Sequence, residues 1–331
     1  MREIGTIPTG SKAWPGRGIF RVDDATYHGL PGLSQTRLKR CRTSLEAFRD
    51  SFSEPDEDTE AKQEGRATHC WFHEGPDAFA RRFLLAPVCG GRKDVDKEAW
   101  IDACRAVADG PEWAGITCKS LKEDVEAAFA AAARRLGKDI VSEDWLHAMR
   151  AMIGNAERHP KIAAIMGGDG LNEIGVFDEW YVEGFERPIL FRGKFDRVKV
   201  YPDQCIGMDT KTMPTFGDPE IESEDEDGNQ VLRWPELRKY GRKYGLPIQC
   251  KAYERLWAGV AADYGLPPEL KMTFAAMEKQ PPHRALWFTP HSDTLASAAV
   301  RIDGWLRDIC KARESGRWPG VPHDLQCVDM S

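Results

Sequence analysis

The chain has 331 residues, of which 41% are hydrophobic, and a formal net charge of −7 at pH 7. This length allows one large domain or two with a real core, and no run of about 18 apolar residues is present to span a membrane. The N-terminal residues lack the apolar centre of a signal peptide, and the nine cysteines lack the C-x-x-C spacing of a zinc ribbon. We expect a cytoplasmic protein with free thiols and no membrane contact.

The acidic charge is concentrated in one segment. Seven Asp and Glu residues lie between Asp218 and Asp227 with no Lys or Arg among them, and they equal the whole net charge. We expect this run, residues 218–228, to be a solvated loop. The rest of the chain is balanced and can carry local basic patches, so the net charge does not exclude a nucleic-acid partner.

The first half of the chain predicts mainly helices. Residues 1–33 are rich in Gly and Pro and predict an irregular N-terminal segment with one short strand at 18–22. From 34 to 170 the apolar spacing is mostly helical, with short acidic or Gly-containing loops. Besides a helix from 34 to 51, the predicted helices cover residues 62–74, 76–85, 97–108, 121–136, 142–158 and 161–166.

The helix predicted from Ser34 to about Ser51 has a basic face. Ser34 is a suitable N-cap, and apolar residues recur at helical spacing behind it. The other face carries Arg37, Arg40 and Arg42. Such a face is either an ordinary solvated surface or a set of phosphate contacts, and the sequence leaves both open.

The helix over 62–74 carries a single candidate ligand. Gly65 and His69 are four residues apart and therefore share a helical face, next to Arg66. The glycine would let this face approach another backbone closely. A lone histidine on an apolar helix is more often a core residue than a metal ligand, so the spacing alone does not assign a role to His69.

The middle of the chain predicts three consecutive strands joined by turns rich in Gly, Pro and Asp. On the second strand Arg192, Lys194 and Asp196 share one face, because side chains alternate along a strand. On the third, Asp209 and Lys211 share a face for the same reason. The predicted strands cover residues 174–182, 189–200 and 205–210.

Adjacent strands could bring Asp196, Asp209 and Lys211 together. Two carboxylates and an ammonium are costly to bury at one point unless something binds there. Mg²⁺ suits the carboxylates, because it takes hard oxygen ligands and keeps waters for a substrate phosphate. The simpler interpretation is a cross-strand ion pair on a solvated face, and this stretch alone does not decide between them.

The last part of the chain adds a second pair of polar residues on a helix. A helix is predicted from Trp234, broken near Gly245, and its second part to Tyr264 carries Gln249 and Tyr253, four residues apart. These two are either a polar edge of a packed helix or part of a site. Two strands, 271–277 and 284–289, and an amphipathic helix, 292–312, are predicted to follow.

The order of these motifs resembles the RecB-like branch of the PD-(D/E)XK nuclease superfamily, and within it the RecE-type exonucleases, such as the C-terminal nuclease of exodeoxyribonuclease VIII. Segments 27–34 (YHGLPGLS), 65–69 (GRATH), 82–87 (RFLLAP) and 317–320 (RWPG) are similar to that family as well. The resemblance covers residues 25–320; the acidic loop and the stretch 119–136 look like additions. In chain order the motifs are Gly65-x-x-x-His69, Glu173, Asp196, Asp209-x-Lys211 and Gln249-x-x-x-Tyr253.

The resemblance implies a metal site with one or two Mg²⁺ ions. Its ligands would be His69, Asp196, Asp209 and the backbone carbonyl of Thr210, with Glu173 binding directly or through a water molecule. Because a histidine replaces a carboxylate found there in related nucleases, we expect Mn²⁺ to substitute for Mg²⁺.

The resemblance also implies the remaining roles. Lys211 would position the attacking water, while Gln249 and Tyr253 would brace the site and contact the DNA backbone. A 5′-phosphate would suit an arginine, because guanidinium binds phosphate through two parallel hydrogen bonds. The residues expected to contact DNA are Arg37, Arg40, Arg42, Arg66 and Lys194.

The fold implied is α/β (α+β), with a PD-(D/E)XK restriction-endonuclease-like core: a central mixed sheet flanked by helices, and a helical N-terminal half. A single nuclease domain would cover 34–320, with a mainly helical part at 34–170, a catalytic sheet at 171–290 and a C-terminal helix at 291–313; 321–331 would be a tail.

The activity implied is Mg²⁺-dependent 5′→3′ digestion of linear double-stranded DNA to 5′-mononucleotides, leaving a 3′ single-stranded overhang for recombination. The partners implied are DNA ends, further copies of the chain in a ring-shaped trimer or tetramer, and a single-strand annealing protein, in a bacterial cytoplasm and of phage or prophage origin. The alternatives are an endonuclease on the same core, a DNA-binding recombination module with an idle site, and a metalloprotein that is not a nuclease.

Overall fold

A mixed β-sheet forms the centre of the computed structural model, which describes residues 2–54, 59–89, 93–224 and 230–321. The strands lie in the order β1-β2-β6-β7-β8-β11-β12, and β3 pairs with the start of β7. Neighbours from β2 to β8 are antiparallel, whereas β11 runs parallel to β8. The strands are β1 Gly5–Thr6, β2 Gly18–Arg21, β3 Leu33–Ser34, β6 Leu171–Trp180, β7 Ile189–Val200, β8 Cys205–Met213, β11 Leu270–Glu278 and β12 Ala285–Phe288.

Helices cover both faces of this sheet. On one face α11 (Leu246–Val260) and α12 (Ser292–Ser315) pack in a core that includes Phe195 and Phe274. On the other face α4 (Glu60–Glu74), α8 (Glu143–Arg158) and α9 (Pro160–Met166) pack against Met208 and Ala275. Alternate residues of β11 therefore enter opposite cores, as the two-residue period of a strand requires. A central mixed sheet flanked by helices confirms the expected fold class.

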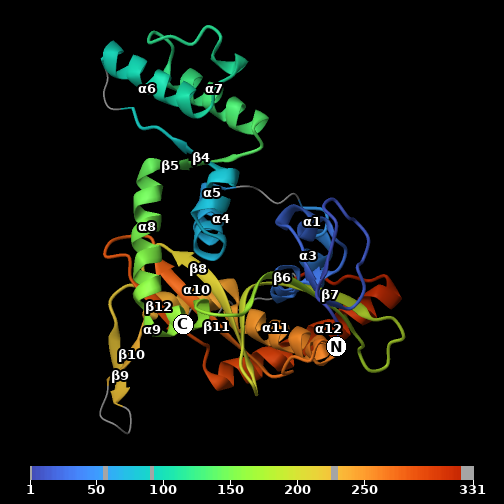
Figure 1. Ribbon diagram of the computed structural model, residues 1–331. Helices are drawn as coiled ribbons and strands as arrows, with labels where there is room; N and C mark the ends of the chain where they lie inside the picture. The colour runs from blue at the N-terminus through green and yellow to red at the C-terminus, as the bar shows by residue number, and fades with distance from the viewer. Residues whose placement is uncertain (1, 55–58, 90–92, 225–229, 322–331) are drawn as a thin grey trace.

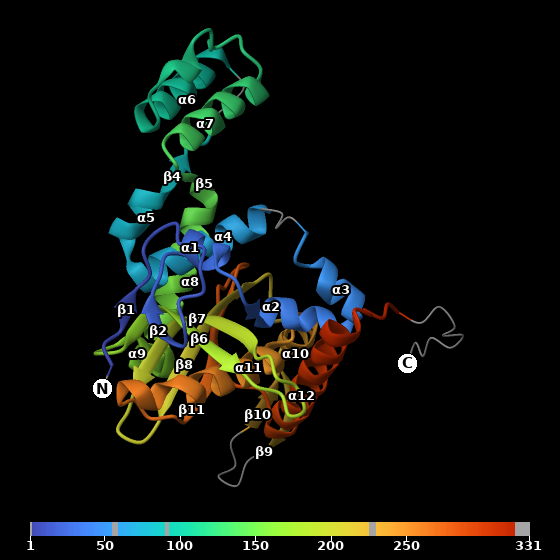
Figure 2. The same ribbon diagram turned by 90° about the vertical axis from the view of Figure 1, so that its right-hand side faces the viewer.

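A separate helical unit stands above the sheet. The chain leaves through β4 (Phe83–Ala86) and returns through β5 (Asp139–Ser142), which pair in parallel and form its stalk (Figures 1 and 2). Between them α6 (Asp94–Val107) and α7 (Lys122–Arg135) pack around a small core of their own, and α5 (Pro76–Arg82) precedes the stalk. That core includes Trp100, Ile101, Trp113, Val125 and Phe129.

The predicted helices and strands are found with three differences. Residues 34–51 form α2 (Gln35–Leu38), a 3₁₀ turn and α3 (Leu45–Asp50) rather than one helix, because the Ser44 side chain accepts a hydrogen bond from the N–H of Ala47 and begins a new helix. Residues 83–86 form a strand because their apolar side chains enter the cores beside β5. The predicted division into parts stays a prediction.

The third difference concerns the segments predicted to be irregular. Within 1–33, β2 belongs to the main sheet and is followed by α1 (Asp24–Gly29). Within the acidic run, β9 (Glu220–Glu224) pairs with β10 (Gln230–Arg233), and 225–229 lie outside the described residues. None of the eight described cysteines is in a disulfide, and none of the described helices is long and apolar enough to cross a membrane.

Candidate active site

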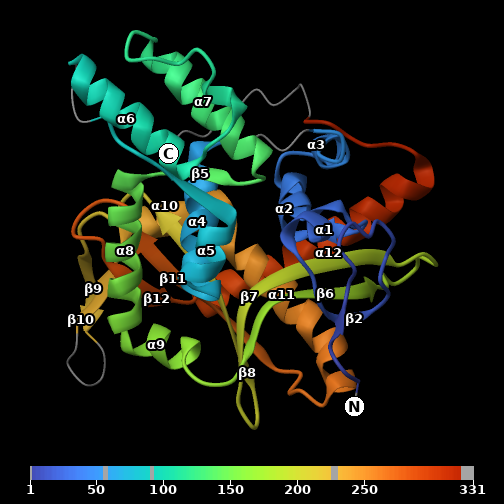
Figure 3. The same cartoon turned by 45° about the horizontal axis from the view of Figure 1, so that its top comes forward.

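The site lies where β7 and β8 stop pairing. Their ladder runs only from Arg197 opposite Met208 to Val200 opposite Cys205, while β3 pairs with β7 near Phe191. Between these two ladders the edge of β7 is uncovered near Asp196. The other edge of β7 pairs with β6, and Figure 3 shows these two strands side by side. A gap of this kind leaves backbone groups of β8 without a strand partner, and they must be satisfied in another way.

Asp196 fills part of this gap. Its Oδ2 accepts a 2.8 Å hydrogen bond from the N–H of Thr210, in place of a backbone acceptor on β7. Since the N–H and C=O of one strand residue point to the same edge, the carbonyl of Thr210 also faces the gap. This orientation fits the ligand role that the resemblance implied for that carbonyl.

His69 reaches the gap from α4 and joins two carboxylates. Its Nε2 lies 3.2 Å from Oε1 of Glu173 and 3.2 Å from Oδ2 of Asp196. Burial opposes the charged imidazole, but the two carboxylates outweigh it and raise the pKa of His69 to about 9. Burial likewise opposes ionisation of Asp196, yet His69 holds the pKa of that carboxyl well below its usual range.

Glu173 has an unusual backbone. It lies in β6 with φ +51°, in the left-handed region that residues with a side chain rarely adopt. Backbone strain of this kind costs about 1–3 kcal/mol and is characteristic of functional sites. Burial is the largest influence on its carboxyl and raises the pKa of Glu173.

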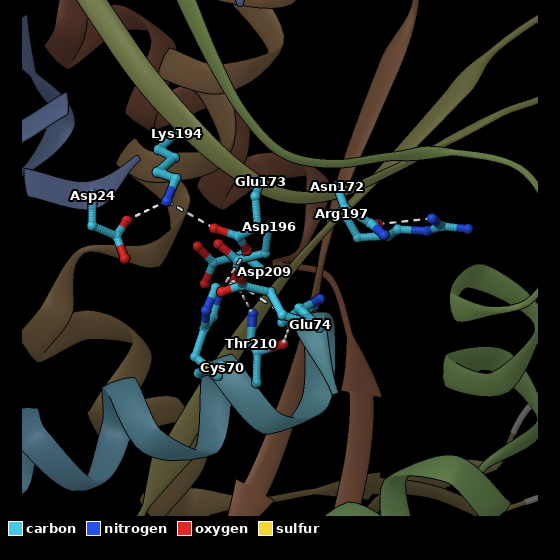
Figure 4. A network of polar contacts seen from close by, with 12 residues as sticks. Asp24, Cys70, Glu74, Asn172, Glu173, Lys194, Asp196, Arg197, Asp209 and Thr210 are labelled. Atoms are coloured by element: carbon cyan, nitrogen blue, oxygen red, sulfur yellow. Dashed lines mark hydrogen bonds and ion pairs between the residues drawn. The ribbon is translucent and has the colours of Figure 1, made fainter. Parts of the chain in front are cut away.

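Lys194 links Glu173 to the N-terminal part of the chain. Its Nζ lies 2.8 Å from Oε2 of Glu173 and also pairs with Asp24 at the start of α1 (Figure 4). Burial opposes the ammonium, but both carboxylates outweigh it and raise the pKa of Lys194 above its usual range. Asp24 was not expected at the site, because nothing near it in the sequence indicates that α1 crosses over β7.

Asp209 and Lys211 form the second half of the site. Lys211 Nζ lies 2.5 Å from Asp209 Oδ2, and Gln249 donates a 2.6 Å hydrogen bond from Nε2 to the other oxygen, Oδ1. Burial opposes the charge on Lys211, but Asp209 and Asp196 outweigh it and raise its pKa, so the side chain stays an ammonium at neutral pH. Gln249 therefore lies where the resemblance implied a bracing residue.

Tyr253 of α11 packs against β7 beside the site. The residue is 5% exposed, and its ring lies 4.5 Å from that of Phe195. Gly193 of β7 lets α11 approach, since a Cβ there would lie 3.0 Å from Cε1 of Tyr253 and 2.8 Å from Cδ2 of Leu256. Such burial fits the bracing role and leaves little of Tyr253 to contact DNA.

His73 is a second histidine that the sequence reasoning missed. It follows His69 by four residues on α4, and its Nε2 lies 2.7 Å from Oγ1 of Thr210 and 4.0 Å from Oδ2 of Asp196. Burial and the charge of His69 lower the pKa of His73 to about 3, so its imidazole is neutral. The spacing of the two histidines was the signal that could have found it.

The basic residues expected to contact DNA fall into two groups. Arg66 and Lys194 line the cleft above the site. The other three lie outside that lining. Arg42 donates to the carbonyls of Arg242 and Lys243. Arg40 pairs with Glu54, and Arg37 lies over the ring of Phe52. Gly65 also lines the cleft, where an added Cβ would meet nothing within 4 Å, so the close backbone approach expected there is absent among the described residues.

The donors fit a divalent cation. Ligand atoms of His69, His73 and Asp196 lie within 4.8 Å of one another, and two carboxylates stand beside them. Oε1 of Glu173 and Oδ2 of Asp209 are buried, and their polar contacts are the ion pairs with His69 and Lys211, so both oxygens face the cationic side of the site. Imidazole nitrogen with carboxylate oxygen suits Mn²⁺ as well as Mg²⁺.

No protein-family model matches the chain, and no curated protein matches it significantly in sequence. Among solved structures, a suspected exonuclease from Eubacterium rectale is 13% identical, with a TM-score of 0.49 over 88% of this chain and 84% of that one. The structure of SSO0001 is 11% identical, with a TM-score of 0.24 over 82% and 84%. At these values neither structure indicates an activity for this chain.

Proposed function

We propose that the chain is a Mg²⁺-dependent exodeoxyribonuclease that digests linear double-stranded DNA. The observation that carries the proposal is one cleft of about 1100 Å³ whose lining includes His69, Glu173, Asp196, Thr210 and Lys211. Two carboxylates, an imidazole and an ammonium facing one open cleft form a set suited to hydrolysis of a phosphodiester. The 5′→3′ direction, the 3′ overhang, a ring-shaped oligomer and an annealing partner rest on the resemblance alone.

Each side chain has a task in this reaction. His69 and Asp196 would hold the cation together with Asp209, the Thr210 carbonyl and Glu173. When bound, the cation supplies positive charge that polarises the phosphate and stabilises its transition state.

Lys211 acts on the attacking water. As an ammonium it accepts no proton, so it orients the water through a hydrogen bond and offsets negative charge that develops on the phosphate. Gln249 fixes Asp209, and Asp209 fixes Lys211, so the three residues form a chain of contacts from α11 to the reacting atoms.

The cleft has positive side chains that an entering polyanion would contact. Lys279 pairs with Glu64, Arg66 with Asp139 and Lys194 with Glu173, so each cation already has an acidic partner. A DNA phosphate must compete with these carboxylates. Each phosphate that a cation binds also releases counterions from the DNA, so we expect binding to weaken steeply with added salt.

The test is digestion of linear duplex DNA labelled at one 5′ end, beside a closed circle, with Mg²⁺, with Mn²⁺ and with EDTA. Metal-dependent release of labelled mononucleotide with an intact circle supports the proposal. Cut circles would make the chain an endonuclease instead. Binding without cleavage of either DNA would leave a DNA-binding module with an idle site.

A further inference from the structure

An aromatic pair stands in the cleft beside the catalytic lysine. Tyr240 and Tyr244 lie four residues apart on α10 (Pro235–Tyr244), with ring centroids 4.3 Å apart and planes inclined by 41°. Both line the same cleft as Lys211 and Thr212. The Tyr240 hydroxyl lies 3.5 Å from the carbonyl oxygen of Thr212, the residue that follows Lys211 on β8. The two tyrosines therefore lie next to Lys211.

The two rings differ in exposure. Tyr244 is 46% exposed, whereas Tyr240 is partly buried and packs against apolar residues of two cores. The Lys243 ammonium lies over the Tyr244 ring, with Nζ 5.3 Å from the ring centroid. Packing accounts for Tyr240, but it does not account for the exposed ring of Tyr244 in a cleft that also holds the charged residues of the site.

The end of α10 is held in place. Arg42 Nη1 donates to the carbonyls of Arg242 (3.0 Å) and Lys243 (3.2 Å) in the last turn of the helix, and the Arg242 carbonyl also accepts from the N–H of Gly245 (3.3 Å). Gly245 follows in the left-handed conformation with φ +61° and ends the helix. Arg42 therefore fixes the helix that carries the two tyrosines, and the DNA contact expected of it from the sequence stays a prediction.

The exposed face of α10 is basic. Four of its ten residues carry positive charge against a single acid, Glu236. The positive residues are exposed, so they attract phosphates to the surface beside the rings. They are Arg238, Lys239, Arg242 and Lys243.

We propose that Tyr240 and Tyr244 form a stacking platform for an unpaired base of the strand whose phosphate enters the site. A basic surface combined with aromatic rings is how proteins hold single-stranded nucleic acid without reading its sequence. A paired base inside a duplex has no free face, so the platform would receive a nucleotide that has left the helix at a frayed end or in a single strand. This inference rests on the proposed function.

The test measures binding without turnover. Wild-type protein is mixed, in Ca²⁺ and separately in EDTA, with DNA that carries 2-aminopurine at its 5′ terminal nucleotide. Three DNAs are compared: a blunt duplex, a duplex whose end is mismatched, and a single strand. Fluorescence quenching reports stacking of that base, and anisotropy of a distant dye reports binding of the whole DNA.

We expect quenching on the mismatched end and the single strand, and loss of it in Tyr244→Leu and Tyr240→Leu. Stacking contributes about 1–3 kcal/mol per base, so each change should weaken single-strand binding by about 5- to 140-fold. Tyr244→Phe keeps the ring and should keep both signals. Tyr181→Leu, which removes a 63% exposed tyrosine outside the cleft lining, should change neither.

The outcomes separate the two proposals. DNA that is bound and digested without quenching, or with quenching that survives both leucine variants, overturns the platform and leaves the nuclease. If anisotropy changes with none of the three DNAs, the protein does not bind DNA, and both the proposed nuclease activity and the proposed stacking platform are refuted. Quenching on the blunt duplex equal to that on the mismatched end would overturn the requirement for an unpaired base, because a terminal base pair offers one open face to a ring.

Discussion

His73 Nε2 lies 2.7 Å from Oγ1 of Thr210, so α4 contacts β8 at the residue whose backbone also binds Asp196. One side chain on the buried face of the helix thereby fixes the strand that carries the proposed metal-binding carbonyl. The histidine stays neutral at neutral pH because burial lowers its pKa to about 3.

Replacing His73 by Phe should therefore weaken metal binding without emptying the site. Loss of a residue that supports a metal ligand typically costs about 10- to 100-fold in affinity. We expect a loss of that size in Mn²⁺ affinity by calorimetry. His147→Phe, at an exposed position on α8, is the control and should leave the affinity unchanged. Equal affinities in both variants would show that His73 only packs.

Lys211→Ala should abolish cleavage and leave binding intact. The ammonium is held 2.5 Å from Asp209 and faces the cleft, so its loss removes charge where the phosphate reacts. Removing one such group costs at least about 100-fold in rate. Single-turnover digestion measures this loss, and DNA affinity in Ca²⁺ should change far less. Lys271→Ala on β11 is exposed and serves as the control; turnover that survives in Lys211→Ala would refute the assigned role.

The sequence indicated which motif residues lie on neighbouring strands, and the roles assigned to them stay predictions. Asp196, Asp209 and Lys211 were expected to come close together; Asp209 contacts Lys211 directly, and Asp196 binds the N–H of Thr210, the residue between Asp209 and Lys211. The expectation of one shared sheet face was too simple. Asp196 contacts His69 of α4, whereas Asp209 contacts Gln249 of α11 on the opposite face, and they approach only through the gap between β7 and β8.

Features that depend on distant parts of the chain could not be predicted. The pairing of Asp24 with Lys194 joins residues 170 positions apart, and nothing in the local pattern of either indicates it. The continuous apolar stripe of residues 34–51 favours one helix, whereas the Ser44 side chain caps a new helix at Leu45 and divides it. The sequence pattern alone does not show that the cap prevails. The stalk of β4 and β5 pairs strands across an inserted helical unit, and short apolar runs such as 83–86 suit a helix or a strand equally.

Glu173 offers a test of backbone strain. Glycine adopts φ +51° without penalty, so Glu173→Gly should relieve the backbone strain at this position. This relief offsets the flexibility that a glycine adds to the unfolded chain. Glu173→Gly should therefore unfold at nearly the same urea concentration as Glu173→Gln. Glu179→Gly, in the same strand but without a positive φ, should lose about 1 kcal/mol relative to Glu179→Gln. Equal losses at the two positions would mean that Glu173 stores no strain. Both variants at 173 should lose activity, because both lack the carboxylate.

Metal binding should release a proton below pH 9. In the metal-free protein Asp196 and Glu173 overcome burial and raise the pKa of His69 to about 9, so Mg²⁺ must displace a proton from the imidazole at neutral pH. Calorimetry in two buffers of different ionisation enthalpy should report about one proton released per ion bound at pH 7. The number of protons released should fall progressively toward pH 9.5. Proton release that persists unchanged in His69→Gln would assign it to another group.

The same pKa predicts how stability changes with pH. A pKa raised from 6.5 to about 9 on folding stabilises the metal-free protein fully below pH 6.5 and loses this contribution as pH rises through 9. Asp196 stays ionised throughout, since its pKa is lowered. Urea unfolding in EDTA should show this decline in the wild type and a smaller one in His69→Gln.

Glu278 should stabilise the fold only in its ionised form, and so only when the pH is not strongly acidic. Its carboxylate, 1% exposed, binds Arg284 through both oxygens (2.7 Å each) and accepts from the N–H of Phe216 (2.9 Å). Burial opposes ionisation, but these bonds outweigh it and lower the pKa of Glu278 from 4.5 to about 2. The contribution is therefore complete above pH 4.5 and is lost as pH falls toward 2.

Glu278→Gln measures that contribution. It keeps the shape of the side chain but removes the charge, so we expect about 1–3 kcal/mol less unfolding free energy at pH 7 and a difference that shrinks toward pH 3. Glu269→Gln, at an exposed position before β11, should have no such effect. A Glu278→Gln protein as stable as the wild type at pH 7 would mean that the Arg284 pair only offsets the cost of burying both charges. The β11–β12 hairpin would then depend on its apolar contacts, Phe274 against Phe288 above all.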